Sequence, residues 1–403
     1  MTPWLTVIGI GEDGIDGLNA SARSALERAE VLVGGSRHLG MVADDGRPRI
    51  EWGKPLAATI EEICDRRGQP VAVLATGDPM WYGIGATLAR NIEPGELRII
   101  PAPSAFSLAA SKLGWALAET ECLTVHGRAI DRVRYFLAPD VRLIILSNDG
   151  DTPGEIARIL TETGLGDSQI NVLTHMSGPD EEVITAEAAE WGDRVVADLN
   201  TIAIHCVAGP GYLARSSVPG LHDEAFSHDG QLTKREIRSA TIAALVPMPG
   251  QLLWDVGAGC GSIAIEWMRS SPRACAIAIE QDEVRGNTIR DNALALGVPD
   301  LELIEGTAPD ALAGLDAPDA VFIGGGLSAD GLLEHCWREL KLEGRLVANS
   351  VTFEGEQILI QWAARTGGEL VRFEISRSGK LGQFTGWQPM KPVTQLRAVK
   401  HDR

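Results

Sequence analysis

Short apolar runs alternate with amphipathic stretches along almost the whole chain, and this alternation limits the fold more than any other sequence feature. Residues 5–8, 71–74 and 252–256 form runs with the length of buried strands, and a stretch with helical period follows each one. Such an order is typical of α/β proteins with largely parallel sheets. The chain has 403 residues, more than one core normally holds, so we expect at least two α/β domains.

The pattern places a set of strands and helices in each part of the chain. We expect strands near residues 5–8, 31–33, 71–74, 97–100, 123–125, 142–146, 171–174, 201–207, 252–256, 276–279, 301–305, 320–323, 345–351 and 370–375. We expect helices near residues 19–29, 57–67, 83–91, 104–113, 128–137, 153–163 and 262–268. The predicted map has a domain at 1–210 with subdomains at about 1–115 and 116–210, a linker at 211–230 and a domain at 231–403.

The start of the last domain carries a local helix signal. Thr233-Lys234-Arg235-Glu236 has the form of a capping box. This form predicts that the Thr233 side chain caps a helix whose third residue is Glu236.

Charge and composition exclude several partners. The formal net charge is −19, and clustered Lys and Arg are what nucleic acids and anionic membranes require, so we expect neither as a partner. The six cysteines form no CxxC pair and the histidines show no metal-binding spacing, so we expect no metal. No apolar run has the roughly 20 residues that span a bilayer, and we expect a soluble, cytoplasmic protein.

A glycine-rich loop at residues 257–261 joins a predicted strand to a predicted helix. Its glycines let backbone N–H groups approach a ligand without a Cβ in the way. Glu280 ends the next strand about 20 residues later, where an acid accepts ribose hydroxyls. This spacing allows either NAD or S-adenosylmethionine, and Asp255 just before the loop favours S-adenosylmethionine.

These residues carry a resemblance. Asp255-x-Gly257-x-Gly259-x-Gly261 resembles the first motif of Rossmann-like (class I) methyltransferases. With the Thr-Lys-Arg-Glu segment at 233–236 and Gly306-Thr307-Ala308-Pro309, residues 220–400 are similar to the precorrin methyltransferases called CbiT. The resemblance implies methylation at C-15 with loss of a carboxylate as carbon dioxide. It implies a cofactor site lined by Thr233, Gly257, Ala258, Gly259, Cys260, Gly261, Glu280 and Ala308.

A second glycine pattern, Gly9-x-Gly11-x-x-Gly14, lies near the amino end and invites a dinucleotide interpretation. We reject that interpretation, because Gly17 prolongs the loop before any helix and no acid ends the following strand. The two glycine loops therefore differ in type, and only the loop at 257–261 has the context of a nucleotide-binding loop.

The segment Gly77-Asp78-Pro79 and the segment 101–106 resemble the tetrapyrrole methylase (class III methyltransferase) family over residues 1–210, and His126-Gly127-Arg128 matches the branch called CbiE. The resemblance implies methylation at C-5, with S-adenosylmethionine folded between two α/β subdomains. It implies a cofactor bordered by Gly77, Asp78, Pro79, Ser104 and Ala105, and a substrate trough that includes Gly9 and Gly11.

Together the two halves resemble the decarboxylating precorrin C(5,15)-methyltransferases, the CbiE–CbiT fusions of the CobL type. The implied substrate is a small polycarboxylate tetrapyrrole, which cationic anchors would hold. The substrate-binding residues that we expect are His126, Arg128, Lys234 and Arg238, with Arg132, Arg134, Arg235, Arg377 and Lys380 as further cationic positions. We also expect a homo-oligomer, and the sequence names no catalytic acid or base.

Two other interpretations remain open. The second domain could methylate a tRNA base, although the acidic charge counts against it. One domain could instead be a scaffold without catalysis. The order of the methylations and whether the tetrapyrrole carries cobalt are not fixed by the sequence.

Overall fold

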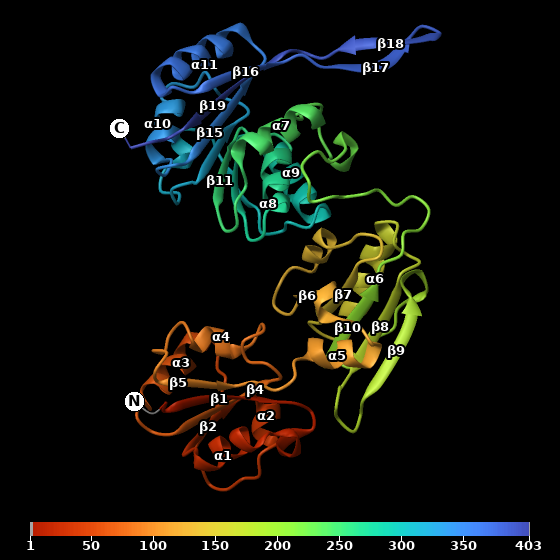
Figure 1. The fold of residues 1–403 in the computed structure, drawn as a ribbon, viewed down its shortest axis with the longest axis vertical. Coiled ribbons are helices and arrows are strands. Elements are labelled where there is room, and N and C mark those ends of the chain that lie inside the picture. The colour runs from red at the N-terminus through yellow and green to blue at the C-terminus, as the bar shows by residue number, and fades with distance from the viewer. Residues whose placement is uncertain (1–2, 403) are drawn as a thin grey trace. The chain divides into compact units, whose positions relative to one another are not determined.

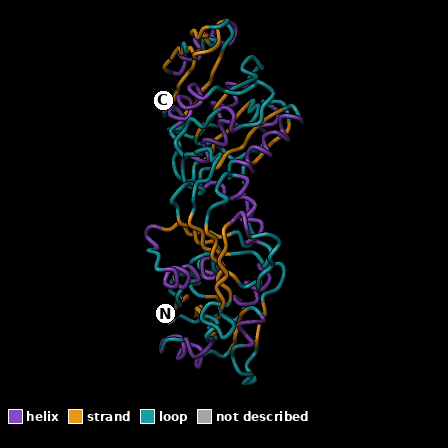
Figure 2. The backbone as a smooth tube through the Cα atoms, turned by 90° about the vertical axis from the view of Figure 1, so that its right-hand side faces the viewer, coloured by secondary structure: helices purple, strands orange, loops and turns teal. Residues whose placement is uncertain are grey.

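The computed structural model describes residues 3–402, which form two compact units. The first unit holds the chain up to Ile130 together with Phe136–Leu213, and the second holds Asp131–Tyr135 together with the chain from Ala214 onward. Residues 131–135, which the predicted map put in the first domain, thus group with the second unit. The alternation of helices and strands along each unit is visible in Figure 2.

The first sheet of the first unit is fully parallel, with the strand order β3-β2-β4-β1-β5. Its strands are β1 (Leu5–Ile10), β2 (Val31–Gly34), β3 (Arg49–Glu51), β4 (Val71–Thr76) and β5 (Leu97–Ile100). The helices of this part are α1 (Ala20–Arg28), α2 (Ser36–Gly40), α3 (Leu56–Cys64) and α4 (Ile84–Leu88). Because parallel strands are buried on both faces, these strands are apolar almost throughout.

The second sheet of this unit is mixed, with the strand order β6-β7-β10-β8-β9. Its strands are β6 (Thr120–Thr124), β7 (Arg142–Leu146), β8 (Gln169–Thr174), β9 (Glu182–Glu187) and β10 (Asn200–His205). Helix α6 spans Thr152–Glu162, and α5 (Ala105–Leu113) packs Phe106 and Ala109 against β7 and β10. The helix expected at 128–137 is wrong, because only a 3₁₀ helix forms, at Ile130–Tyr135.

The second unit is built on one seven-stranded sheet with the order β13-β12-β11-β14-β15-β19-β16 (Figure 1). Its strands are β11 (Leu252–Val256), β12 (Cys275–Glu280), β13 (Glu302–Glu305), β14 (Ala320–Ile323), β15 (Arg345–Ser350), β16 (Glu369–Phe373) and β19 (Val393–Val399). Its helices are α7 (Arg235–Leu245), α8 (Ser262–Ser270), α9 (Glu283–Ala295), α10 (Leu332–Glu339) and α11 (Phe353–Thr366). Strand β19 runs antiparallel between β15 and β16.

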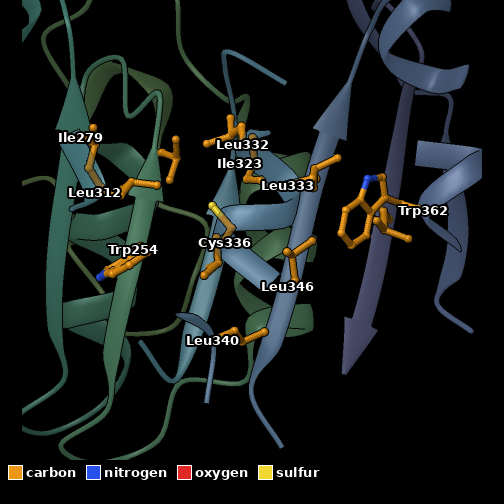
Figure 3. Packing of buried hydrophobic residues seen from close by; sticks show 14 of the residues in the cluster. Trp254, Ile279, Leu312, Ile323, Leu332, Leu333, Cys336, Leu340, Leu346 and Trp362 are labelled. Carbon is orange, nitrogen blue, oxygen red and sulfur yellow. The ribbon is translucent and has the colours of Figure 1, made fainter. Parts of the chain in front are cut away.

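One face of this sheet carries the largest cluster of buried side chains. Figure 3 shows Trp254, Cys336, Leu346 and Trp362 packed between β11, β14, β15 and the helices α10 and α11. This core holds the strands rigidly, so the loops at their carboxyl ends are fixed in place. The loop after β11 is the glycine-rich loop.

Helix α7 begins differently from the capping box that the sequence predicted. Lys234 occupies the N-cap position, and no side chain of that residue caps the helix. Instead, Asp223 accepts the Arg235 backbone N–H through Oδ1 at 2.9 Å. The prediction for Thr233 is therefore wrong: an acid from an earlier segment satisfies the free backbone donor, which is also attracted to negative charge at a helix start.

Asp223 lies in the segment 211–230 that the sequence analysis called a linker. Part of this segment packs against the second unit, because Leu221 and Phe226 are buried in a cluster with Cys260 and Ile265. This segment therefore brings its buried residues close to the glycine loop.

A two-stranded ribbon, β17 (Ser376–Leu381) with β18 (Phe384–Pro389), forms a sheet of its own. In Figure 1 it extends away from the seven-stranded sheet. Leu381, Phe384 and Trp387 are exposed on it. No strand pattern in the sequence had predicted this ribbon. No helix within residues 3–402 is long and apolar enough to cross a membrane.

Candidate cofactor and substrate sites

In the first unit, the loops after β1, β4 and β5 lie in direct backbone contact. The Gly77 N–H donates to the Ile10 carbonyl at 3.1 Å, and the Ala102 N–H donates to the Gly77 carbonyl at 3.1 Å. A Cβ on Gly9 would stand 2.0 Å from the Gly77 oxygen and 2.5 Å from the Ala102 nitrogen. Only glycine at position 9 allows these loops to meet.

This packing corrects one prediction. Gly9 was expected to contact the substrate, but it is buried under the Gly77 loop and lines neither of the two cavities described next. Its role is to let the Gly77 loop sit close to β1. Gly11, two residues later, does line a cavity.

The larger cavity of the first unit is a cleft of about 630 Å³. Among the predicted residues, Asp78, Ser104, Ala105, His126 and Arg128 all line it. The structure therefore brings together residues as far apart in the sequence as Asp78 and Arg128, which are 50 positions apart. Gly77 lines the smaller cavity instead, and Pro79 packs beneath Gly83 and Gly85.

Three aromatic residues that the sequence analysis did not single out also line this cleft. The ring of Trp81 lies 4.8 Å from that of Phe106, and the Tyr82 ring lies 6.1 Å from Phe106. The Arg128 guanidinium stands 5.2 Å from the centre of the Tyr82 ring. A flat ring system with anionic edges suits such a wall, since rings stack on aromatic faces and carboxylates pair with arginine.

Ser104 has a clear structural role at the same cleft. Its Oγ accepts the Ser107 N–H at 3.1 Å and so caps helix α5. The cap fixes the start of α5, and with it Ala105 and Phe106, at the wall of the cleft.

The smaller cavity, a hollow of about 60 Å³, holds a polar network that the sequence analysis missed. Glu12 pairs with Arg37 through Oε1 and with His175 Nδ1 through Oε2, the latter at 3.1 Å. Arg37 Nη2 also donates to Thr76 Oγ1 at 3.0 Å. Burial, with the nearby Arg37 charge, lowers the pKa of His38 to about 4, so His38 is neutral.

In the second unit, the glycine loop adopts backbone conformations that favour glycine. Gly257, Gly259 and Gly261 have φ values of +70°, +63° and +78°. A Cβ on Gly257 would stand 2.7 Å from the Gly325 Cα, in the loop after β14. The loop thus turns sharply and presents its backbone at the start of α8, where a helix favours negative groups and hydrogen-bond acceptors.

Glu280 ties this loop to the end of β12. Its Oε2 accepts the Gly259 N–H at 2.8 Å, and its Oε1 accepts the N–H groups of Gln281 and Asp282 at 3.0 and 3.1 Å. The side chain is buried, and a carboxylate offers about four acceptor positions, so one remains for a ligand hydroxyl.

Asp255 is the second buried acid of this loop. Its Oδ2 accepts the Ala264 N–H at 3.0 Å, whereas its Oδ1 is buried without a hydrogen-bond partner among the described residues. Burial, and secondarily the Glu280 charge, raises the pKa of Asp255 to about 7. An unpartnered buried acceptor beside a backbone cradle fits a ligand that brings hydrogen-bond donors or positive charge.

The remaining predicted cofactor residues of this unit take different positions. The Cys260 side chain is buried with Leu221, Phe226 and Leu232, and burial raises its thiol pKa. It belongs to the core, so position 260 offers a ligand only its backbone. Thr233 is half-buried, and Ala308 packs at the edge of the main core.

Arg238 is not a substrate anchor. Its side chain is 0% exposed and pairs with Glu266 at 2.7 Å and with Asp223 at 3.2 Å. It also donates to the backbone carbonyls of Leu221 and Thr233. These partners account for its donors, so this prediction is wrong: Arg238 fastens the segment before α7 to α8.

Sequence comparison with known proteins bears on both units. Residues 5–191 match the family of tetrapyrrole (corrin/porphyrin) methylases, and residues 224–400 match the precorrin methyltransferase domain. A precorrin-6Y C(5,15)-methyltransferase [decarboxylating] from a Sinorhizobium species is 48% identical over 397 residues, which cover 98% of this chain and 96% of the relative. The chain belongs to this family.

Two shorter relatives each match part of the chain. A cobalt-precorrin-7 C(5)-methyltransferase from Salmonella typhimurium is 33% identical over 40% of this chain and 80% of its own length. A probable cobalt-precorrin-6B C(15)-methyltransferase (decarboxylating) from Pyrobaculum calidifontis is 30% identical over 44% of this chain and 94% of its own length.

Membership in the family confirms several predictions. The chain is a decarboxylating precorrin methyltransferase of cobalamin biosynthesis, and it joins a tetrapyrrole methylase domain to a Rossmann-like methyltransferase domain.

Proposed function

We propose that each unit binds its own S-adenosylmethionine and methylates one meso carbon of a precorrin. The first unit acts at C-5, and the second acts at C-15 and removes a ring acetate carboxylate as carbon dioxide. Relatives that match less than half of the chain are named for only one of these methylations, which supports a division of labour.

The observation that carries the proposal is that each unit has its own set of candidate cofactor residues. The first unit has a cleft of about 630 Å³ with Asp78, Ser104 and Arg128 in its lining. The second unit has a left-handed glycine loop joined to Glu280. One set of candidate cofactor residues in each unit supports two cofactors per chain.

The residues of the two sites suit methyl transfer. S-adenosylmethionine, when bound, supplies an electrophilic methyl group on a positively charged sulfur. A meso carbon between two pyrrole-type rings is enamine-like, so the protein needs chiefly to align the partners and exclude water. In the second unit we assign one ribose hydroxyl to Glu280, and we assign the cationic end of the cofactor to the unpartnered Asp255 Oδ1.

The substrate carries many carboxylates. In the first unit, we assign His126 and Arg128 to them, since both line the cleft. In the second unit, Lys234 and the exposed Lys380 remain as anchors from the sequence prediction, because Arg238 is buried. Arg377 is less available, as it pairs with Glu236 at 2.6 Å and Asp223 at 3.0 Å.

Loss of carbon dioxide needs an acceptor for the electron pair that the carboxylate leaves behind. The conjugated ring becomes cationic when its meso carbon gains a methyl group, and it can take this pair. We therefore place decarboxylation after methylation at C-15, in the second unit.

The test uses the full chain with the Gly259→Asp substitution. An aspartate side chain at a left-handed position beside Glu280 would block the loop, so methylation at C-15 and decarboxylation should stop while methylation at C-5 continues. Gly250→Asp is the matched control, because Gly250 is also left-handed but faces open space. Mass spectrometry of the product distinguishes the outcomes, and loss of both methyl groups would contradict the proposal.

We also propose that the chain forms a homo-oligomer through the ribbon β17–β18. The ribbon exposes the large apolar side chains of Leu381, Phe384 and Trp387 to water. Burying them against a second copy of the chain would be favourable. Phe384→Asp should lower the mass measured by light scattering, and an unchanged mass would contradict this. We also propose that the two domains span residues 1–210 and 231–403. We propose a cytoplasmic location for the protein.

A further inference from the structure

The polar network in the hollow of the first unit has no place in the function described so far. The hollow is lined by Gly11, Gly77, Ala105 and His175, among others, and it shares Thr76, Ala105 and Thr201 with the large cleft. The network therefore lies where two cavities of one unit adjoin.

His175 reaches this hollow from the loop that follows β8. Its backbone is left-handed, with φ of +44°, which is uncommon for a residue other than glycine and costs about 1 kcal/mol or more. Two hydrogen bonds hold this conformation: the His175 N–H donates to the Leu199 carbonyl at 3.2 Å, and its own carbonyl accepts the Gly178 N–H at 2.8 Å. Unfavourable backbone held in this way is frequent at functional sites.

Glu12 fixes the chemical state of His175. Its carboxylate accepts from His175 Nδ1 at 3.1 Å, so the proton of the neutral ring belongs on Nδ1 and Nε2 is left with a free lone pair. A half-buried carboxylate such as Glu12 that orients an imidazole in this way also stabilises the imidazolium that forms when Nε2 takes up a proton.

The surroundings keep Glu12 in place. Arg37 of α2 pairs with its other oxygen and is itself held by Thr76 at the end of β4. Gly178 faces the Glu12 side chain closely, since a Cβ there would stand 2.9 Å from the Glu12 Cβ. The charged and titratable groups around His175 are thus Glu12 and Arg37, then His38 behind Arg37.

Two acidic residues stand on the His175 loop itself, the exposed Asp180 and Glu181. Glu181 accepts the Ser177 N–H and pairs with Lys112 of α5. They neutralise each other, so Glu12 is the group that acts directly on the ring.

We infer that His175 is the proton acceptor for methyl transfer in the first unit and that Glu12 is its positioning residue. The inference rests on the proposed function. When the meso carbon attacks the methyl group, a carbon–carbon bond forms, and the methyl–sulfur bond breaks with its electron pair going to sulfur. The ring system becomes cationic and must lose one proton, from the meso carbon or from a ring nitrogen.

His175 Nε2 takes that proton and becomes an imidazolium opposite the Glu12 carboxylate, while the ring returns to a neutral conjugated form. The hollow of about 60 Å³ holds a water molecule but not a tetrapyrrole. The proton therefore reaches Nε2 from a ring edge at the mouth of the hollow or through one water molecule.

The experiment uses the full chain carrying Gly259→Asp, so that any methyl transfer to the precorrin comes from the first unit. His175→Gln and Glu12→Gln are added to this parent, and His205→Gln is the matched control, a histidine of the same unit at the end of β10. Single-turnover rates are measured from pH 5 to 9, and S-adenosylmethionine binding is measured by calorimetry.

His175→Gln should lower the rate about 10²- to 10⁴-fold, the usual range for a lost proton acceptor, and leave cofactor affinity within about threefold. The parent should lose rate at acid pH, and His175→Gln should lack this acid limb. Glu12→Gln should lower the rate about tenfold.

A measurement without substrate adds a second readout. Nitrogen NMR of labelled histidine at pH 8.5 should show His175 in the Nδ1–H form in the parent and in a mixture of forms in Glu12→Ala.

The inference is overturned if His175→Gln keeps its rate within threefold, keeps the acid limb, or loses cofactor binding and rate together. If the parent itself yields no methylated product, the proposed function fails and the inference falls with it. That outcome is recognised because the parent and all variants are then equally inactive.

Discussion

The two units both depend on glycine, but for different physical reasons. Gly9 of the first unit is required because backbone atoms of other loops occupy the place of its Cβ. Gly259 of the second unit is required mainly because its backbone is left-handed, and the nearest atom to its Cβ would be the Gln231 oxygen at 3.3 Å. A glycine pattern in a sequence therefore does not say whether glycine serves packing or backbone geometry.

The two sites also differ in charge. The first cleft has Arg128 beside aromatic rings, whereas the second loop has two buried acids, Asp255 and Glu280. Ligand binding at a site with buried acids depends on pH and on the charge of the ligand, whereas ligand binding in a cleft of backbone groups and rings depends chiefly on shape. The predictions below test this difference.

The largest effect should come from Gly9→Val. Its side chain would overlap the Gly77 carbonyl, so the first unit should lose roughly 3 kcal/mol or more of stability together with its cofactor site. Binding at the second unit should remain. Gly14→Asn is the control, since Gly14 is left-handed in open space and asparagine tolerates that conformation. Thermal unfolding and calorimetry measure both effects, and normal binding by Gly9→Val would contradict the packing argument.

The stability of the second unit should depend on the pH because of Asp255. Its pKa is about 7 in the folded chain and has the ordinary value of 3.8 in the unfolded chain, so folding favours the protonated form. This stabilisation is fully present below about pH 4 and is lost as the pH rises through 7, for a total of roughly 4 kcal/mol.

Urea unfolding from pH 4 to 8 should show this loss of stability in the unsubstituted protein and in the control Asp316→Asn. In Asp255→Asn, this dependence of the free energy of unfolding on pH should be absent. The same slope in all three proteins would mean that Asp255 is not responsible.

Glu280→Gln should weaken S-adenosylmethionine binding at the second unit about 10- to 100-fold, because hydrogen bonds to a charged group contribute about 1.5–3 kcal/mol. Binding at the first unit should stay the same. Glu283→Gln, which changes an exposed acid on the following helix, is the control. Calorimetry measures both sites, and an equal loss at the two units would contradict their independence.

The smallest expected effect is a difference in stability between two variants, each with a substitution at the start of a helix. Ser104→Ala should cost about 1 kcal/mol because it removes the cap of α5, whereas Thr233→Ala should change stability by less than about 0.5 kcal/mol because Asp223, not Thr233, caps α7. Chemical denaturation of both variants gives the comparison. A larger loss of stability for Thr233→Ala than for Ser104→Ala would support the capping box at Thr233.

Much of the fold followed from the sequence because its strands are long enough and apolar enough to show. The run at 252–256 and the glycines after it gave the strand, loop and helix of the second site. Strand β9 was missed because its alternating residues are only half apolar, and β17–β18 was missed because a ribbon outside the core has no buried face to pattern.

The candidate sites were less predictable than the fold. Arg238 pairs with Asp223 and Glu266, which are 15 and 28 positions away in the sequence. No local sequence pattern therefore predicts that this arginine is buried. Likewise, Glu12 and His175 are 163 positions apart and meet only after both sheets form. The aromatic run Trp81-Tyr82 beside Gly77-Asp78 was a signal that could have been used.

The central claim is that one chain holds two independent cofactor sites, and calorimetric titration of the full chain with S-adenosylmethionine tests it most directly. We predict two bound molecules per chain, of which Glu280→Gln weakens one and Gly9→Val removes the other. One bound molecule per chain, or none, would contradict the account.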